Sequence, residues 1–288
     1  MQHTIRFHVD DIMSSHKDAA INDEFAQWAN KKYRNIKKVS AQRGKIHEFL
    51  GMKIDFKVEP GKCHIIQKDY VEEIVSAWPE EIKVKDTVLT PAANDLYKRG
   101  EGGLLNKEKK EIFHTIVAKC LFVAKRSRPD ILPTVSLLSG RVREPNKDDW
   151  GKARRLIQYL NGTMDLHLVL HFDNLSIARW HVDASFGVHE DFKSQSGGLL
   201  ILSLAGGAII SSSSKQKLNT RSSTEAELVA VDDFIGKLLW TQRLLREQGY
   251  NLQKNILYQD NKSAILLETK GRSSLGQRSR ALLLRYFS

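Results

Sequence analysis

Three acidic residues in the second half of the chain stand where a metal-dependent reaction can be built. Asp183 ends an apolar strand-like run, Asp260 ends another, and Glu227 lies in the first turn of a long predicted helix. Carboxylates from two neighbouring strand ends and from a helix over the sheet can converge on one point. Such oxygens suit Mg²⁺, which also binds phosphate, with Mn²⁺ as an alternative ion. Two such ions about 4 Å apart support phosphodiester hydrolysis, which is the chemistry these residues predict.

Each of these residues also has a structural explanation. Thr224 and Glu227 have the spacing of a helix capping box. Asp260 can simply belong to a turn, and so can the Asp10-Asp11 pair in the first half. Asp183 is harder to explain in this way, because we expect it to be buried within its apolar strand, where a charge needs a partner or a metal ion.

The elements that would position these carboxylates begin after about residue 165, where the pattern becomes rich in strands. The expected strands are residues 166–172, 177–185, 198–204, 208–213 and 255–258. The expected helices are residues 263–269 and 224–248, the latter with a buried face of Leu228, Val231, Ile235, Leu238 and Leu245. This order predicts a mixed sheet covered by helices.

The first half of the chain mixes short strands with helices. A strand, a tight turn at Asp10-Asp11 and a second strand are expected over residues 4–13. One strand is expected over residues 49–56, and it should pair with residues 63–67. The expected helices are residues 22–33, 70–78, 108–125 and 148–160, with another opened by Arg128-Pro129-Asp130 and a polar connector over residues 80–107. The fold class is therefore mixed α/β.

The charge of the chain favours a polyanionic partner. Lysine and arginine number 45 against 34 acidic residues, a net charge of +11, and basic proteins bind nucleic acids by releasing counterions from the phosphates. The alternative is a set of solvated helix faces. The candidate nucleic-acid contacts are Lys125, Arg126, Arg128, Lys152, Arg154, Arg155, Lys215 and Lys217.

The remaining composition indicates an intracellular protein. Cys63 and Cys120 are the two cysteines, too few for a disulfide framework or a metal cluster, which fits a reducing compartment. No apolar run is long enough to cross a membrane, and the first residues have no signal-peptide pattern. We therefore expect a protein of the cytoplasm or nucleus, neither secreted nor bound to a membrane.

Three motifs in the second half closely resemble the RNase H domain of copia-type LTR retrotransposons. They are Asp183-Ala184-Ser185, SSTEAE at residues 222–227 and QDNKSA at residues 259–264. The resemblance implies that Asp183, Glu227 and Asp260 are catalytic carboxylates that bind two Mg²⁺ ions. Within SSTEAE it favours Glu227 over Glu225.

The first half resembles the reverse transcriptase of the same elements. Residues 7–11 (FHVDD) look like the aromatic-x-Asp-Asp motif, which makes Asp10 and Asp11 polymerase metal ligands, and residues 49–54 (FLGMKI) resemble the strand that follows. SRPDI at residues 127–131 and YLNGT at residues 159–163 resemble the stretch that joins polymerase to RNase H. The match extends over nearly the whole chain.

The resemblance implies a piece of a Pol polyprotein with three parts. Residues 1–57 would be the end of an incomplete reverse-transcriptase palm, 58–165 a thumb or connection-like region, and 166–288 an RNase H-like domain with a truncated last helix. The implied partners are an RNA–DNA hybrid, whose RNA strand would be hydrolysed, and the rest of the polyprotein. We also expect the first third to be poorly ordered, so that proteolysis leaves a core from about residue 165.

The chain departs from the family pattern at three places. It lacks the polymerase aspartate that lies upstream of the Asp-Asp turn, so no polymerase activity is expected from this chain alone. His8 replaces the aromatic residue of that motif. Near the end, Leu283 and Ala281 replace a fourth metal-binding aspartate and a histidine. Two other readings therefore stay open: an inactive element remnant that only binds nucleic acid, and an interaction protein that uses the sheet as a scaffold.

Overall fold

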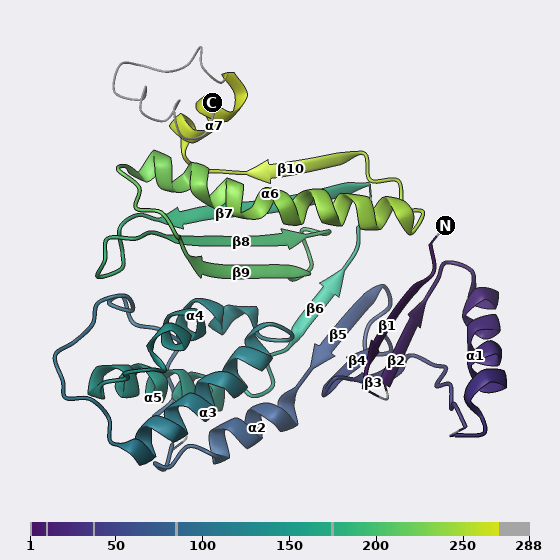
Figure 1. The fold of residues 1–288 in the computed structure, drawn as a ribbon, viewed down its shortest axis with the longest axis horizontal. Coiled ribbons are helices and arrows are strands. Elements are labelled where there is room, and N and C mark those ends of the chain that lie inside the picture. The colour runs from purple at the N-terminus through teal and green to yellow at the C-terminus, as the bar shows by residue number, and fades with distance from the viewer. Residues whose placement is uncertain (1, 10, 37, 84–85, 174–175, 271–288) are drawn as a thin grey trace.

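The computed structural model describes residues 2–9, 11–36, 38–83, 86–173 and 176–270, which form three sheets and a group of packed helices (Figure 1). At the amino terminus, β1 (Thr4–His8) and β2 (Asp11–Ser15) form the expected hairpin. Helix α1 (Ala19–Tyr33) begins before the predicted residue 22, because the Asp18 side chain caps it by accepting a hydrogen bond from the Ala20 amide.

The strand predicted over residues 49–56 is wrong, because the chain reverses in the middle of it. Strand β3 (Ile46–Phe49) turns at Leu50-Gly51 and returns as β4 (Met52–Asp55). Leu50 and Gly51 have φ of 52° and 66°, and two successive positive φ values are typical of a tight hairpin turn. The predicted pairing of β4 with β5 (Lys62–Ile66) is confirmed.

Strand β6 (Leu168–His171) joins β5 and completes the sheet β3-β4-β5-β6. The expectation that this run starts the sheet of the second half is therefore wrong, because an apolar strand pattern predicts a strand but not its partner. The sheet of the second half still contacts β6 through a loop, in which the Gly207 amide donates a hydrogen bond to the Val169 carbonyl at 2.7 Å. A Cβ at Gly207 would lie 2.4 Å from the Leu168 side chain, so glycine permits this approach.

The predicted helices between these sheets are confirmed to within a few residues and enclose one apolar core. They are α2 (Lys68–Ser76), α3 (Lys107–Ala124), the 3-10 turn η2 (Pro129–Ile131), α4 (Leu132–Arg141) and α5 (Lys147–Gly162). Asn146 and Asp149 form a reciprocal capping box that starts α5. The described part of the connector before α3 is irregular.

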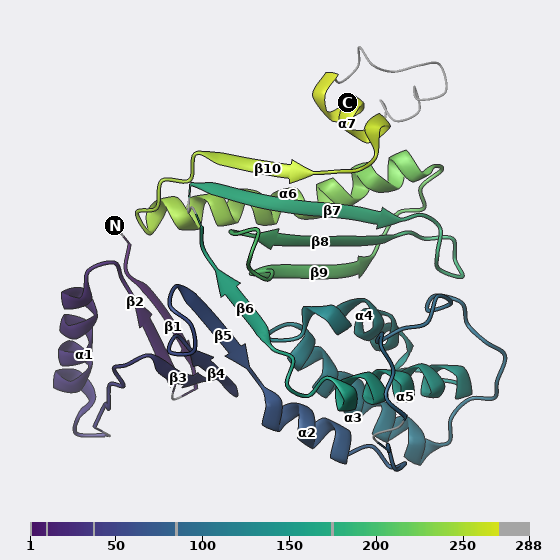
Figure 2. The same cartoon turned by 180° about the vertical axis from the view of Figure 1, so that it is seen from behind.

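The second-half sheet has the strand order β10-β7-β8-β9 and is mixed, as predicted. Its elements are β7 (Ile177–Ser185), β8 (Gln195–Ile201), β9 (Ile210–Lys215), the long helix α6 (Ser223–Glu247), β10 (Lys254–Tyr258) and α7 (Lys262–Lys270). Helix α6 covers one face of the sheet, and the other face is seen from behind in Figure 2.

The buried face of α6 differs from the predicted one at one turn. Ile235 was expected inside and is 47% exposed, whereas Phe234 is 1% exposed and packs with Trp180 and Ala230. Gly198 of β8 makes room for the Phe234 ring, since a Cβ there would lie 2.4 Å from it.

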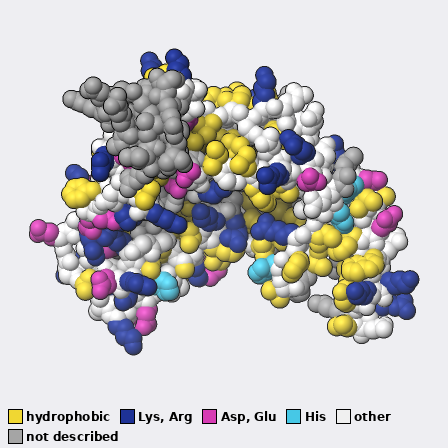
Figure 3. Space-filling model, turned by 45° about the horizontal axis from the view of Figure 1, so that its top comes forward, with side chains coloured by type: hydrophobic (Ala, Val, Ile, Leu, Met, Phe, Trp, Pro, Cys, Tyr) yellow, Lys and Arg dark blue, Asp and Glu magenta, His cyan; other side chains and the backbone are white. Residues whose placement is uncertain are grey.

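No helix among the described residues is long and apolar enough to cross a membrane. Figure 3 shows one face of the molecule, on which lysine and arginine side chains surround a central hollow with apolar walls. The predicted limits at residues 57 and 165 stay predictions.

Candidate metal centre

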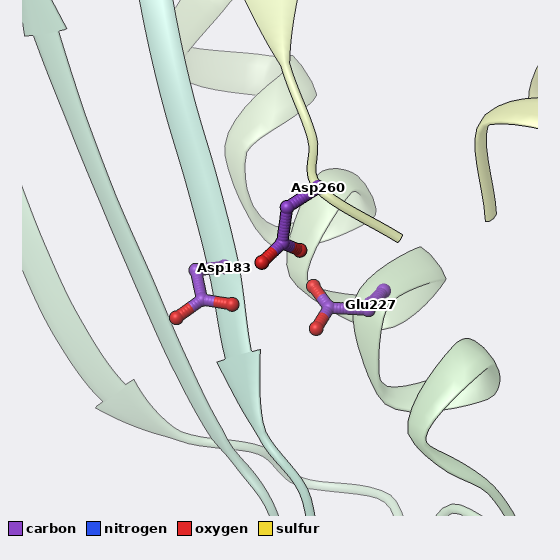
Figure 4. A group of neighbouring side chains, drawn as sticks. All are labelled: Asp183, Glu227 and Asp260. Atoms are coloured by element: carbon purple, nitrogen blue, oxygen red, sulfur yellow. The ribbon is translucent and has the colours of Figure 1, made fainter. Parts of the chain in front are cut away.

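Three elements bring Asp183, Glu227 and Asp260 together. Strand β10 runs parallel to β7 with Tyr258 opposite His181. Asp260 and Asp183 each follow two residues later, so they lie at the same end of adjacent strands. Glu227 approaches from the first turns of α6 (Figure 4). One carboxylate oxygen of each residue lies within 4.8 Å of the others, and we call this group the carboxylate triad.

The helix start shows that Glu227 is not a capping residue. The cap of α6 is Ser222, whose Oγ accepts a hydrogen bond from the Glu225 amide at 3.2 Å. Glu225 in turn accepts one from the Arg221 amide at 2.7 Å. The capping box expected from Thr224 and Glu227 is therefore wrong. Residues two apart lie on nearly opposite sides of a helix, so Glu225 serves the helix start while Glu227 reaches the strand ends.

Burial is distributed differently from the prediction. Asp183 is exposed, and so is Asp260, whereas Glu227 is 5% exposed. The expectation of a buried Asp183 is wrong because its side chain lies on the sheet face that α6 does not cover. Glu227, on the helix, is therefore the carboxylate that the fold removes from solvent.

The environment of Glu227 disfavours its negative charge. Burial, together with the nearby charges of Asp183 and Asp260, raises the pKa of Glu227 from 4.5 to about 7. Gln259 opposes these effects, since its Nε2 donates a hydrogen bond to Glu227 Oε2 at 3.0 Å. Three carboxylates held this closely repel one another, and a cation between them relieves that repulsion.

The donor set fits a hard divalent cation. Every donor is a carboxylate oxygen, the ligand type that Mg²⁺ and Mn²⁺ prefer. The two exposed aspartates leave one side open to solvent, which an ion that keeps several waters requires. Asp183 and Asp260 would contact such an ion from the strand ends, and Glu227 from the helix.

A groove of about 820 Å³ leads away from the triad, with Asp183 and Asp260 in its lining. It lies over the sheet face opposite α6, and its other wall is formed by η2 and the start of α4. The rings of His181 and Tyr258 stack in its floor, with centroids 4.6 Å apart and an interplanar angle of 9°.

Among the described residues, no other predicted acidic position joins this group. Asp10 lies outside the described residues. Asp11 is exposed at the start of β2, opposite His8, and in the described part of the chain it belongs to no comparable acidic group. Leu283 and Ala281 also lie outside the described residues, so the absence of a fourth carboxylate from the site stays a prediction.

Arg128 is not a free nucleic-acid contact, which corrects the prediction. It is 1% exposed and pairs with Asp130 at 2.8 Å. Its guanidinium also donates to the carbonyl and hydroxyl oxygens of Thr163, and the Tyr159 hydroxyl donates to Asp130 at 2.9 Å. These contacts join the SRPDI and YLNGT motifs, so Arg128 has a structural role.

The basic side chains of α5 hold the connector. Their partners are the Lys98 carbonyl for Lys152, the Glu80 carboxylate for Arg154 at 3.3 Å, and the Thr90 hydroxyl for Arg155 at 2.9 Å. Much of their hydrogen-bonding capacity is therefore used within the protein. A role for them in nucleic-acid binding stays a prediction.

The other candidate cations lie nearer the second sheet. Lys215 pairs with Asp191 at 2.8 Å, and Lys217 is exposed. Lys125 and Arg126 line a cavity of about 190 Å³ that adjoins the groove.

Two residues of the site were missed in the sequence. Gln259 holds Glu227, and its place next to Asp260 was an available signal. Gln216 is buried and donates to the Ala226 carbonyl at 2.8 Å and to Ser196 Oγ at 3.0 Å. It thereby fixes the start of α6 against β8, which no sequence pattern indicates.

Comparisons with known proteins give the chain its relatives, although no protein-family model matches it. It is 28% identical to the retrovirus-related Pol polyprotein from transposon TNT 1-94 of Nicotiana tabacum, over 77% of this chain and 17% of that protein. It is 29% identical to the corresponding polyprotein from transposon RE2 of Arabidopsis thaliana, over 90% of this chain and 17% of that protein. The chain thus spans a small part of the length of these relatives.

A third relative is matched over most of its own length. The chain is 31% identical to the putative transposon Ty5-1 protein of Saccharomyces cerevisiae, over 80% of this chain and 72% of that protein. All three relatives come from transposons. The chain therefore belongs to the family of copia-type retrotransposon Pol polyproteins.

Proposed function

We propose that this chain is a reverse transcriptase–RNase H part of a retrotransposon Pol polyprotein that binds an RNA–DNA hybrid and hydrolyses its RNA strand. The observation that carries the proposal is the carboxylate triad, in which three oxygens lie within 4.8 Å of one another at the end of a groove. The resemblance of the three motifs that supply these carboxylates to the RNase H domain suggests the hybrid as substrate.

Each residue of the triad has a part in the proposed reaction. Asp183 and Asp260 hold the open side of the site, where the RNA phosphate enters with a water molecule. Glu227, fixed by Gln259, closes the site from the helix. Two bound Mg²⁺ ions would activate the attacking water and stabilise the leaving oxygen. The water oxygen bonds to phosphorus as the bond from phosphorus to the leaving oxygen breaks, and that oxygen takes up a proton.

Cleavage of a labelled RNA–DNA hybrid tests the proposal, with Mg²⁺ or Mn²⁺ and in EDTA. We expect metal-dependent cutting of the RNA strand that falls at least about 100-fold in Asp183→Asn and Asp260→Asn, because each change removes a charge from the ion site. Asp232→Asn is the matched control, since Asp232 is an exposed carboxylate on α6. Cutting that persists in the triad variants would contradict the proposal.

A second candidate function is nucleic-acid binding without cleavage. The net charge of +11 favours it, because binding through phosphates needs no metal site. Salt-sensitive binding of the hybrid with no cleavage under any metal condition would select this function over the first.

A further inference from the structure

The groove at the triad continues into the smaller cavity. The two share Pro129, Ala208 and Ser211 in their linings, so they form one path over the open face of the sheet. Its length follows from the strand register. Asp183 is level with Ser213 of β9 through the intervening strand, and Ile210, at the far end, lies three residues earlier. The path therefore extends roughly 10 Å along the strands and, because β9 lies two strands from β7, roughly 10 Å across them.

Beside the triad, the floor of this path offers a flat aromatic surface. Tyr258 stacks on His181 and is itself 42% exposed. One face of the Tyr258 ring therefore packs on His181, and the ring remains accessible to a ligand. Gly197 and Ser211 line the path beside these rings with little side-chain bulk. A carboxylate in the opposite wall, Asp130, is already paired with buried Arg128.

The far end of the path is cationic. Lys125 and Arg126 line it. Two further cations interact with them electrostatically: Arg6 of β1 with Arg126, and Lys237 of α6 with Lys125. Within the described part of the chain, none of these four residues forms an ion pair, and Asp233 is an acidic neighbour of Lys237. Burial lowers the pKa of Arg126 and of Lys237, and the neighbouring cations lower both further.

Lysine and arginine side chains gather around a central hollow on the face drawn in Figure 3. Cations gathered against their mutual repulsion are typical of a phosphate-binding surface.

We propose that this path holds one nucleic-acid strand, with a base stacked on Tyr258 and a phosphate bound by Lys125 and Arg126. This inference rests on the proposed function, because it gives the direction in which a strand leaves the triad. At about 3.4 Å per nucleotide of a stacked strand, the bound phosphate lies about four nucleotides from the phosphate at the triad. A charged groove with a stacking ring is also how proteins bind single strands.

Binding of fluorescein-labelled single-stranded RNA and DNA, measured by anisotropy in EDTA, tests the proposal without cleavage. The full chain is used. Lys125→Ala/Arg126→Ala should weaken binding at least about tenfold at 0.1 M salt. It should also reduce the slope of log affinity against log salt by about 0.7 for each phosphate that the protein no longer neutralises. The matched control is Lys107→Ala/Lys110→Ala, which removes two exposed lysines from the opposite end of α3.

The stacking ring has a different signature. Tyr258→Leu should weaken binding about tenfold without changing the salt slope, because it removes stacking and no charge. Tyr258→Phe, which keeps the ring, should bind like the wild type and shows that the ring is what matters. Circular dichroism and thermal melting establish that each variant is folded.

The outcomes separate this inference from the proposed function. Groove variants that bind like the Lys107/Lys110 control would overturn the inference, whether or not the hybrid is cleaved. Groove-dependent binding without cleavage would support it while contradicting the catalytic proposal. If the variants weaken the binding of RNA and DNA equally, the path contacts phosphates and bases and does not distinguish the two sugars. If they weaken the binding of only one, that nucleic acid is the strand that occupies the path.

Discussion

At the scale of single residues, the site is a concentration of like charge that the fold tolerates. Glu227 is buried beside two aspartates, and its carboxylate accepts hydrogen bonds from the Gln259 side chain and the Ala184 backbone. Groups arranged in this way usually destabilise the protein that carries them and are found at functional sites. The carboxylate most affected is also the one that a cation would help most.

Replacing Glu227 by Gln is expected to stabilise the metal-free protein at pH 8. The pKa of Glu227 is raised from 4.5 to about 7 in the folded protein, so the folded state keeps a proton that the unfolded state releases. Stability is therefore lost as pH rises from about 4.5 to 7. Glutamine carries no charge, so the free energy of unfolding should rise by on the order of 1–3 kcal/mol at pH 8 and little at pH 4.

Urea denaturation in EDTA at the two pH values measures this difference. Asp232→Asn, on the exposed side of the same helix, should show no gain that depends on pH. Added Mg²⁺ should stabilise the wild type more than Glu227→Gln. A gain of equal size at pH 4 and pH 8 would mean that side-chain shape, and not charge, explains the effect.

The basic residues show that residue type alone does not assign a role. Arg126 and Arg128 are two positions apart in sequence, yet Arg128 is buried and fully paired, while Arg126 lies over the Phe122 ring at 3.6 Å and faces a cavity. Buried arginine with a carboxylate and two oxygen acceptors is a structural crosslink. The fold, and not the spacing, separates the two.

At the scale of elements, α6 must sit close to the sheet for Glu227 to reach the strand ends. Phe234 sets that distance, because its ring lies directly over Gly198. Two turns separate Phe234 from Glu227 on the same helix, so a displacement at the ring is carried to the carboxylate. The helix thus couples core packing to the geometry of the triad.

Gly198→Ala is expected to destabilise the protein and to weaken metal binding. The new Cβ would lie 2.4 Å from the Phe234 ring, which forces α6 away at a cost of about 1–3 kcal/mol. The control is Gly236→Ala on α6 itself, where a Cβ meets nothing within 4 Å. That change should stabilise the protein by about 0.5–1 kcal/mol.

Thermal melts and Mn²⁺ titration by calorimetry compare the two glycine variants. If Gly198→Ala melts earlier but binds Mn²⁺ as the wild type does, α6 adjusts locally and the proposed coupling to Glu227 is wrong.

The sequence predicted most elements and the members of the triad, but not several long-range features. Strand and helix patterns are local, so they revealed the order of elements and the mixed sheet. The turn at Leu50-Gly51 was missed because a leucine with positive φ carries no turn signal. Phe234 replaced Ile235 on the buried face because Gly198, far away in sequence, provides the space. Asp183 was expected inside because its strand neighbours are apolar, and alternation along the strand places it outside.

At the scale of the whole molecule, β6 links the two halves of the chain. It pairs with β5, more than a hundred residues earlier, and accepts a hydrogen bond from Gly207 in the loop between β8 and β9. The sheet β3-β4-β5-β6 therefore contains residues from both sides of the predicted limit at residue 165. Residues 46–66 are held by this pairing, in contrast to the hairpin before them.

The β1–β2 hairpin is attached more weakly than the sheet that follows. It reaches α6 through the Gln2 amide to the Glu247 carbonyl, at 2.8 Å, and through Gln248 to Thr4, at 2.7 Å. Its apolar side chains remain largely uncovered, with Phe7 76% exposed. Segments with few buried contacts open locally at low free energy.

Limited proteolysis should therefore remove the first residues and stop at β3. We expect trypsin to cut between α1 and β3, where Lys38, Arg43 and Lys45 lie in an irregular exposed stretch, and to leave a resistant fragment that begins near residue 46. Mass spectrometry of the digest identifies the new amino terminus. A resistant fragment that begins near residue 166, as the sequence predicted, would instead mean that β5 and β6 separate readily, because cleavage of residues 46–165 requires that pairing to open. Hybrid binding by the fragment from residue 46 would then show whether Arg6, which is removed with the hairpin, contributes to the cationic end of the groove.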